Sequence, residues 1–157
     1  MASGRGRLRR MHMDLPPGVT FAIEDAPASS DAEALAWGLE AFNDLAWPGH
    51  QPWQTLGVFL RREGKVVGGL AGELHAGWMF IKYFFLEEAL RRHGIGHAVI
   101  AAAEARALER GCHSAWVDTF SFQAPEFYRK QGYAEFGRLP YPPVGERIFL
   151  QKRLAPG

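Results

Sequence analysis

A chain of 157 residues is the usual length of one domain, and 47% apolar residues are ample for one hydrophobic core. The net charge of +1 argues against a dedicated nucleic-acid-binding protein, because such domains usually carry a large basic excess. The single cysteine, Cys112, excludes an internal disulfide and is typical of a reducing compartment.

The sequence gives no sign of a membrane span or a secretory signal. No stretch reaches the roughly 18 uninterrupted apolar residues that a span needs. The first 13 residues contain arginines but no apolar segment of the kind that a secretory signal has. We therefore expect a flexible basic tail over residues 1–15, one domain over residues 16–157, a cytoplasmic location, and neither membrane nor nucleic-acid partners.

The first predicted elements are a strand and an amphipathic helix. Val19 to Glu24 alternates in polarity as a strand does. Ser30 and Glu33 have the spacing of a capping box, and the helix predicted from Asp31 to Trp47 carries an apolar stripe at Leu35, Leu39 and Phe42. A loop rich in aromatic and helix-breaking residues follows, over residues 47–53.

Three successive strands are predicted next. Thr55 to Arg62 and Lys65 to Leu74 form a hairpin around Glu63 and Gly64, and a second turn leads into Trp78 to Leu86. The third strand is apolar on both faces, which is typical of a central strand in a sheet covered by helices.

The second half of the chain alternates helices and strands. Gly94 to Arg110 and Ala124 to Gln131 are predicted helices, and Ser114 to Phe120, Tyr133 to Arg138 and Arg147 to Lys152 are predicted strands. The order β-α-βββ-α-β-α-β-β predicts an α/β fold with one mixed central sheet and helices on both faces.

The segment between the third strand and the following helix has the features of a phosphate-binding turn. Gly94 and Gly96 allow a sharp turn and a close approach of the backbone, and Arg91 and Arg92 add positive charge. The free amides and dipole of a helix start attract anions, and pyrophosphate fits both. A dinucleotide-binding turn would want a third glycine where Val99 stands. A tight connection without a ligand explains the glycines equally well on spacing alone.

Two motifs together resemble the GNAT (GCN5-related N-acetyltransferase) family. Arg91-Arg-His-Gly-Ile-Gly96 resembles its signature Arg/Gln-x-x-Gly-x-Gly/Ala, which wraps the pyrophosphate of acetyl-coenzyme A. Ala124 to Tyr133 is similar to its Ala-x-x-Phe-Tyr-x-x-x-Gly-Phe/Tyr segment, at the family's spacing. The resemblance covers residues 19–153 and is strongest for an uncharacterised bacterial branch. The chain departs from the common pattern at Glu88 and Arg92, and neither change removes a phosphate-facing amide.

The resemblance implies an N-acetyltransferase with acetyl-coenzyme A as co-substrate. His93 and His97 are four residues apart without the intervening Glu of a zinc-binding helix, so we expect no metal. In the family, a splayed central strand holds the pantetheine arm like an added strand, and one of its backbone amides, here that of Phe85 or Leu86, polarises the thioester carbonyl. The implied cofactor-binding residues are Phe84, Phe85, Leu86, Arg91, Arg92, His93, Gly94, Ile95, Gly96 and His97.

Two residues are candidates for the catalytic proton transfers. The resemblance implies that Tyr128 protonates the leaving thiolate, and the alternative is that its ring only packs against the cofactor arm. Glu73 interrupts an apolar strand at the expected active-site end, so it is a candidate base or amine anchor. A water relay without a dedicated base is the competing explanation.

The acceptor is expected to be a primary amine of a small molecule or a peptide. Four residues are candidates to line its site: Trp47, Trp53, His75 and Asp118. The main alternative function is a non-catalytic acyl-coenzyme A sensor that uses the same turn. The family resemblance also allows a homodimer, which no residue of the sequence demands.

Overall fold

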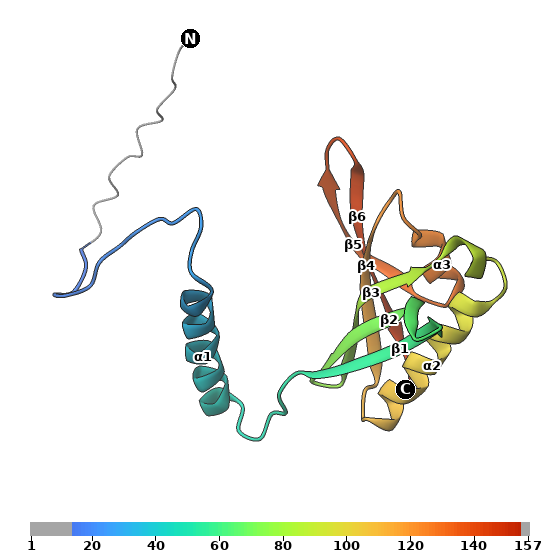
Figure 1. Ribbon diagram of the computed structural model, residues 1–157. Helices are drawn as coiled ribbons and strands as arrows, with labels where there is room; N and C mark the ends of the chain where they lie inside the picture. Colours follow the sequence, from blue (N-terminus) through green and yellow to red (C-terminus); the bar gives the residue numbers. More distant parts are fainter. Residues whose placement is uncertain (1–13, 155–157) are drawn as a thin grey trace, which may run out of the picture. The chain divides into compact units, whose positions relative to one another are not determined.

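The computed structural model describes residues 14–154, so all but the last two positions of the predicted basic tail lie outside the described residues (Figure 1). The chain divides into two compact units, residues 1–48 and residues 49–157. No helix within residues 14–154 is long and apolar enough to cross a membrane.

Within its described part, residues 14–48, the first unit contains one helix, α1 (Ser29–Ala46), at the place predicted from the apolar stripe. Two local predictions in this unit are wrong. Ala28 occupies the N-cap position without a side-chain hydrogen bond, so Ser30 and Glu33 do not form the capping box. No strand forms over residues 19–24, because a strand needs a partner to hydrogen-bond with and none of the described strands lies in this unit.

The second unit is built on a six-stranded sheet in the order β1-β2-β3-β4-β6-β5. Its β3–β4 pair is parallel and its other pairs are antiparallel, so the sheet is mixed, as predicted. The strands are β1 (Gln54–Arg62), β2 (Lys65–His75), β3 (Trp78–Leu86), β4 (Ser114–Phe120), β5 (Ala134–Tyr141) and β6 (Gly145–Arg153). Between β3 and β4 come a 3-10 turn, η1 (Glu88–Leu90), and α2 (Ile95–Glu109), and α3 (Pro125–Lys130) follows β4.

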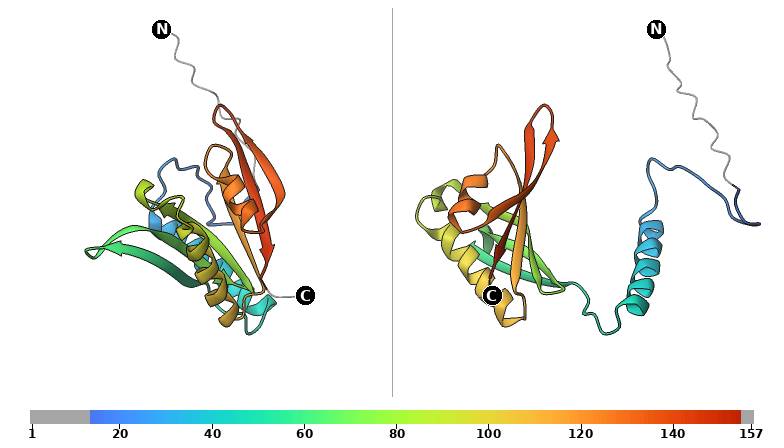
Figure 2. Two further views of the ribbon diagram at one scale, coloured as in Figure 1. Left: turned by 90° about the vertical axis from the view of Figure 1, so that its right-hand side faces the viewer. Right: turned by 180° about the vertical axis from the view of Figure 1, so that it is seen from behind.

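One hydrophobic core joins α2 and α3 to the same face of this sheet. Helix α2 runs beside β1, β2 and β3 (Figure 2). The largest fully buried side chains come from β2, β3, α2, β4 and β6: Leu70, Met79, Ile100, Val117 and Leu150. Burial of such side chains is worth about 2 kcal/mol each, so this layer fixes the position of α2 on the sheet.

The central strands β3 and β4 separate partway along their length. The parallel ladder of β3 and β4 runs from Trp78 and Ser114 to Ile81 and Val117 and ends there. Both strands continue, to Leu86 and to Phe120. At the same level the register of β2 against β3 shifts by one residue, which leaves Lys82 as an extra residue in a β-bulge. The splay expected for the central strand is therefore present.

A partly buried ionic cluster ties α2 to Tyr133, which follows α3, and to β6. Glu104 of α2 accepts hydrogen bonds from the Tyr133 hydroxyl at 3.0 Å and from the Lys152 ammonium at 2.7 and 2.9 Å. The Glu104 side chain is only 14% exposed. Its removal would leave two polar groups without their acceptor in a partly desolvated place.

Replacing Glu104 with Ala should therefore lower the free energy of unfolding by about 2 kcal/mol. Glu109, on the same helix, pairs with Arg106 where both side chains are more than half exposed. Glu109→Ala is the matched control, and its effect should stay below about 0.5 kcal/mol. Urea denaturation measures both variants, and equal destabilisation would contradict the structural role of Glu104.

Candidate functional site

The turn after β3 places a set of backbone amides at one point. Arg91 Nε donates to the Leu86 carbonyl at 2.9 Å and so closes the loop onto the strand end. Arg92 and Gly94 both have left-handed backbones, with φ of 65° and 73°. The first intrahelical bond of α2 runs from Ala98 N to Gly94 O, so the amides of residues 95–97 precede it and are available to an anion.

Gly96 brings this helix start against α3. It is buried, and a Cβ there would approach the Phe127 ring to 3.0 Å and the Phe84 ring to 3.4 Å. These two rings stack on each other with centroids 5.1 Å apart. His97 Nδ1 also lies 2.5 Å from Gln131 Oε1 at the end of α3. Both sequence motifs therefore meet in one place, around the splayed end of β3.

Tyr128 lies inside this junction. Its side chain is 6% exposed and its ring packs against Phe84, Phe127 and Tyr133. Burial raises the pKa of the Tyr128 phenol to about 12, and the negative charge of Asp118 adds to the rise. The Tyr128 hydroxyl therefore stays protonated at neutral pH.

Asp118, a candidate to line the acceptor site, is engaged in an ion pair. Its Oδ1 accepts a hydrogen bond from Arg147 Nε at 2.7 Å. The Arg147 guanidinium also contacts the rings of Phe120 and Phe149, whose centroids lie 5.8 and 5.7 Å from it. Sequence reasoning did not single out Arg147, whose partner becomes visible only once β4 and β6 are paired.

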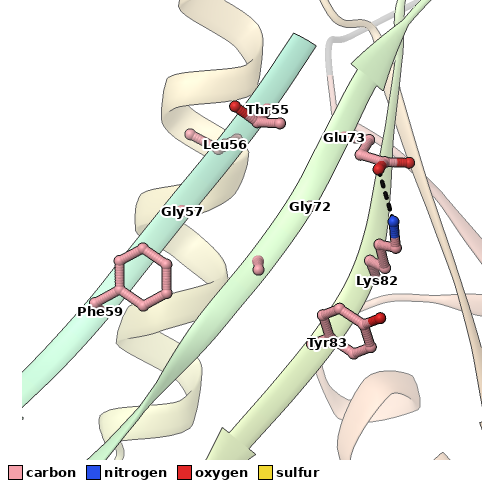
Figure 3. A pocket seen from close by; sticks show the side chains of 9 residues that line it. Thr55, Leu56, Gly57, Phe59, Gly72, Glu73, Lys82 and Tyr83 are labelled. Carbon is pink, nitrogen blue, oxygen red and sulfur yellow. Dashed lines mark hydrogen bonds and ion pairs between the residues drawn. The ribbon is translucent and has the colours of Figure 1, made fainter. Parts of the chain in front are cut away.

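Glu73 lines a pocket of about 300 Å³ over β1, β2 and β3 (Figure 3). Its carboxylate accepts a hydrogen bond from the Lys82 ammonium at 2.8 Å, and this bond raises the pKa of Lys82. Lys82 is not among the residues predicted from the sequence. Its diagonal position from Glu73 across the β2–β3 turn was the signal that could have identified it.

The other candidate residues lie in different places. His75 stacks on Trp53 with ring centroids 4.5 Å apart and an interplanar angle of 8°. Neither ring lines the Glu73 pocket. Trp47 belongs to the first unit, as the C-cap of α1. His93 lies exposed in the turn, and Phe85, on the splayed part of β3, is 59% exposed.

Comparisons with known proteins agree with this geometry. Residues 21–133 match the family model described as Acetyltransferase (GNAT) family. The chain is 32% identical over 137 residues to acetyltransferase Atu2258 of Agrobacterium fabrum, across 86% of this chain and 99% of that protein. Blasticidin-S acetyltransferase of Streptomyces morookaense is 40% identical over 93 residues, 58% of this chain and 68% of that protein. A crystal structure of an acetyltransferase from Bacillus cereus has a TM-score of 0.75 at 29% identity, covering 84% and 97%.

Raising the pH above about 10 should destabilise the fold through Tyr128. An unfolded tyrosine ionises near pH 10, whereas folded Tyr128 keeps its proton until about pH 12. Its contribution is therefore intact below pH 10 and is lost, by roughly 1 kcal/mol per pH unit, between pH 10 and 12. Urea titrations across this range should give a shallower decline for Tyr128→Phe than for the original chain. Parallel declines would refute the shift.

Proposed function

The chain belongs to the acetyltransferase (GNAT) family and is an acetyltransferase, and on this premise we propose that it moves an acetyl group from acetyl-coenzyme A to a primary amine in a ternary complex. The observation that carries the proposal is the free backbone edge of β3 after Ile81, directly followed by the amide-rich turn at residues 91–97. The free edge of β3 can hydrogen-bond to an extended amide chain, and the amides of the turn can bind phosphate.

We propose that the pyrophosphate of coenzyme A binds the amides of residues 95–97 beside Arg91 and Arg92. The fit rests on Gly94, around which a side chain would find open space, so the backbone is accessible from outside. The pantetheine arm then hydrogen-bonds along residues 84–86 of β3. In this pose the amide of Phe85 or Leu86 points at the thioester carbonyl and stabilises the oxyanion as the amine attacks.

The reaction exchanges one bond for another. The neutral amine nitrogen attacks the carbonyl carbon, the carbon–sulfur bond breaks with its electron pair going to sulfur, and the amine proton ends on the thiolate. A tyrosine of pKa about 12 does not lose its proton outright to a thiolate of pKa near 8.5. Tyr128 therefore donates a hydrogen bond to sulfur and passes on the amine's proton as the bond breaks.

A non-catalytic acyl-coenzyme A sensor was the main alternative. The chain matches 99% of the length of one curated acetyltransferase and 68% of another, which favours catalysis. One of these relatives is named for blasticidin-S as its acceptor, and this likeness supports a small-molecule amine as the acceptor here.

Two glycines at opposite ends of α2 test the phosphate site. Gly94 and Gly111 both have a left-handed backbone, and a Cβ at either would meet open space. Replacing either with Ala should cost about 1 kcal/mol of stability. Gly94→Ala alone should raise the Kd for coenzyme A about tenfold, because strain there displaces the phosphate-facing amides. Calorimetry with coenzyme A measures this, and equal Kd values for the two variants would argue against the assignment.

Tyr128→Phe should lower kcat about 100-fold and leave KM for acetyl-coenzyme A within about threefold, because only the hydroxyl at sulfur is lost. Tyr133→Phe is the matched control. It removes another buried phenol hydroxyl, the one that donates to Glu104, and should reduce stability while lowering kcat by less than about threefold, because this hydroxyl affects the reaction only through the position of α3. Thiol release at saturating amine measures both variants. An unchanged kcat in Tyr128→Phe would leave its ring with a packing role only.

A further inference from the structure

The Glu73 pocket has a shape and charge of its own that the acetyl-transfer chemistry does not require. The small residues Gly57 and Ala71 line it together with the Phe59 and Tyr83 rings, which are 51% and 67% exposed. Figure 3 shows these two rings on β1 and β3. A Cβ on Gly57 would collide with the Phe59 ring, so glycine is needed for that ring to lie where it does. The result is a shallow slot between two aromatic rings.

One end of this slot presents two opposite charges side by side. Glu73 of β2 and Lys82 of the β3 bulge are 2.8 Å apart, and their side chains remain 30% and 42% exposed. Both are thus within reach of a ligand. Tyr83 lies next to Lys82, whose ammonium is 6.0 Å from the Tyr83 ring centroid. The bulge residue Lys82 directly follows Ile81, the last β3 residue paired with β4, so the charged end lies where the free edge of β3 begins.

This arrangement discriminates between classes of amine. A ligand with only an ammonium group would take Glu73 from Lys82 and leave the Lys82 charge facing another cation. A ligand with only a carboxylate would pair with Lys82 and leave the Glu73 charge facing another anion. A ligand that carries both an ammonium and a carboxylate can pair with Glu73 and Lys82 together, so no charge loses its partner.

We propose that this pocket is the acceptor site and that it selects amino-acid-like amines, with an ammonium paired to Glu73, a carboxylate paired to Lys82 and a flat apolar group between Phe59 and Tyr83. The proposal rests on the acetyl transfer proposed above. Glu73 anchors the amine before it loses its proton, and the positive charge of Lys82 favours that loss.

Three matched probes test the charge requirement: L-phenylalanine, L-phenylalaninamide and phenethylamine, which share the ring and the amine and differ at the carboxylate. With acetyl-coenzyme A, kcat/KM from thiol release should be at least about tenfold higher for L-phenylalanine than for the other two. Lys82→Met should bring this ratio close to one. Arg62→Met, which removes the cation of the exposed Arg62–Glu87 pair outside the pocket, should keep the ratio.

Binding separates the failure of this inference from the failure of the proposed reaction. Calorimetry on the protein saturated with coenzyme A should rank the same three probes in the same order, and Lys82→Met should abolish the ranking. Equal binding and equal turnover of all three would overturn the acceptor class and leave the acetyltransferase reaction intact. Ranked binding without thiol release from any amine would support the pocket and count against the proposed reaction. No binding of any probe would overturn the pocket assignment.

Discussion

The end of the β3–β4 ladder after Ile81 and Val117 is the constraint around which the proposed site is arranged. A strand inside a sheet normally satisfies its backbone groups by hydrogen bonds to a neighbouring strand on each side. Beyond this point β3 still bonds to β2, through residues as far as Leu86, but not to β4. Backbone groups left free in this way favour a ligand that can hydrogen-bond as a strand does. The amide-rich turn lies directly after that edge.

The position of Tyr128 depends on contacts remote from the thioester. Gly132 ends α3 with a left-handed backbone, and Tyr133 then turns its hydroxyl back to Glu104 on α2. Lys152 of β6 shares the same carboxylate. Through this cluster, α3 is fixed to α2 at one end, while Phe127 packs against Gly96 at the other. The proposed acid is therefore held by the same helix whose start is proposed to bind phosphate.

Much of the second unit could be predicted from local sequence. The bounds of β3 and β4 match the predicted ones, because turn residues and a continuous apolar run define their ends. The strand over residues 19–24 was wrong because alternation alone says nothing about whether a partner is present. The bulge at Lys82 could not be predicted from the sequence of β3 alone, because it shifts the register of that strand against β2. Register is a property of two strands, and one strand's pattern does not contain it.

The bulge at Lys82 also determines on which face of the sheet each later side chain of β3 lies. Side chains alternate between the two faces of a sheet, so one additional residue exchanges the faces of everything that follows it. Because Lys82 is that additional residue, Phe84 and Leu86 turn toward the helices and Phe85 turns away from them. Loss of a single residue here would reverse this order, turn apolar rings to the surface and aim the backbone amides of the strand end in other directions. The length of this strand is thus as tightly constrained as its composition.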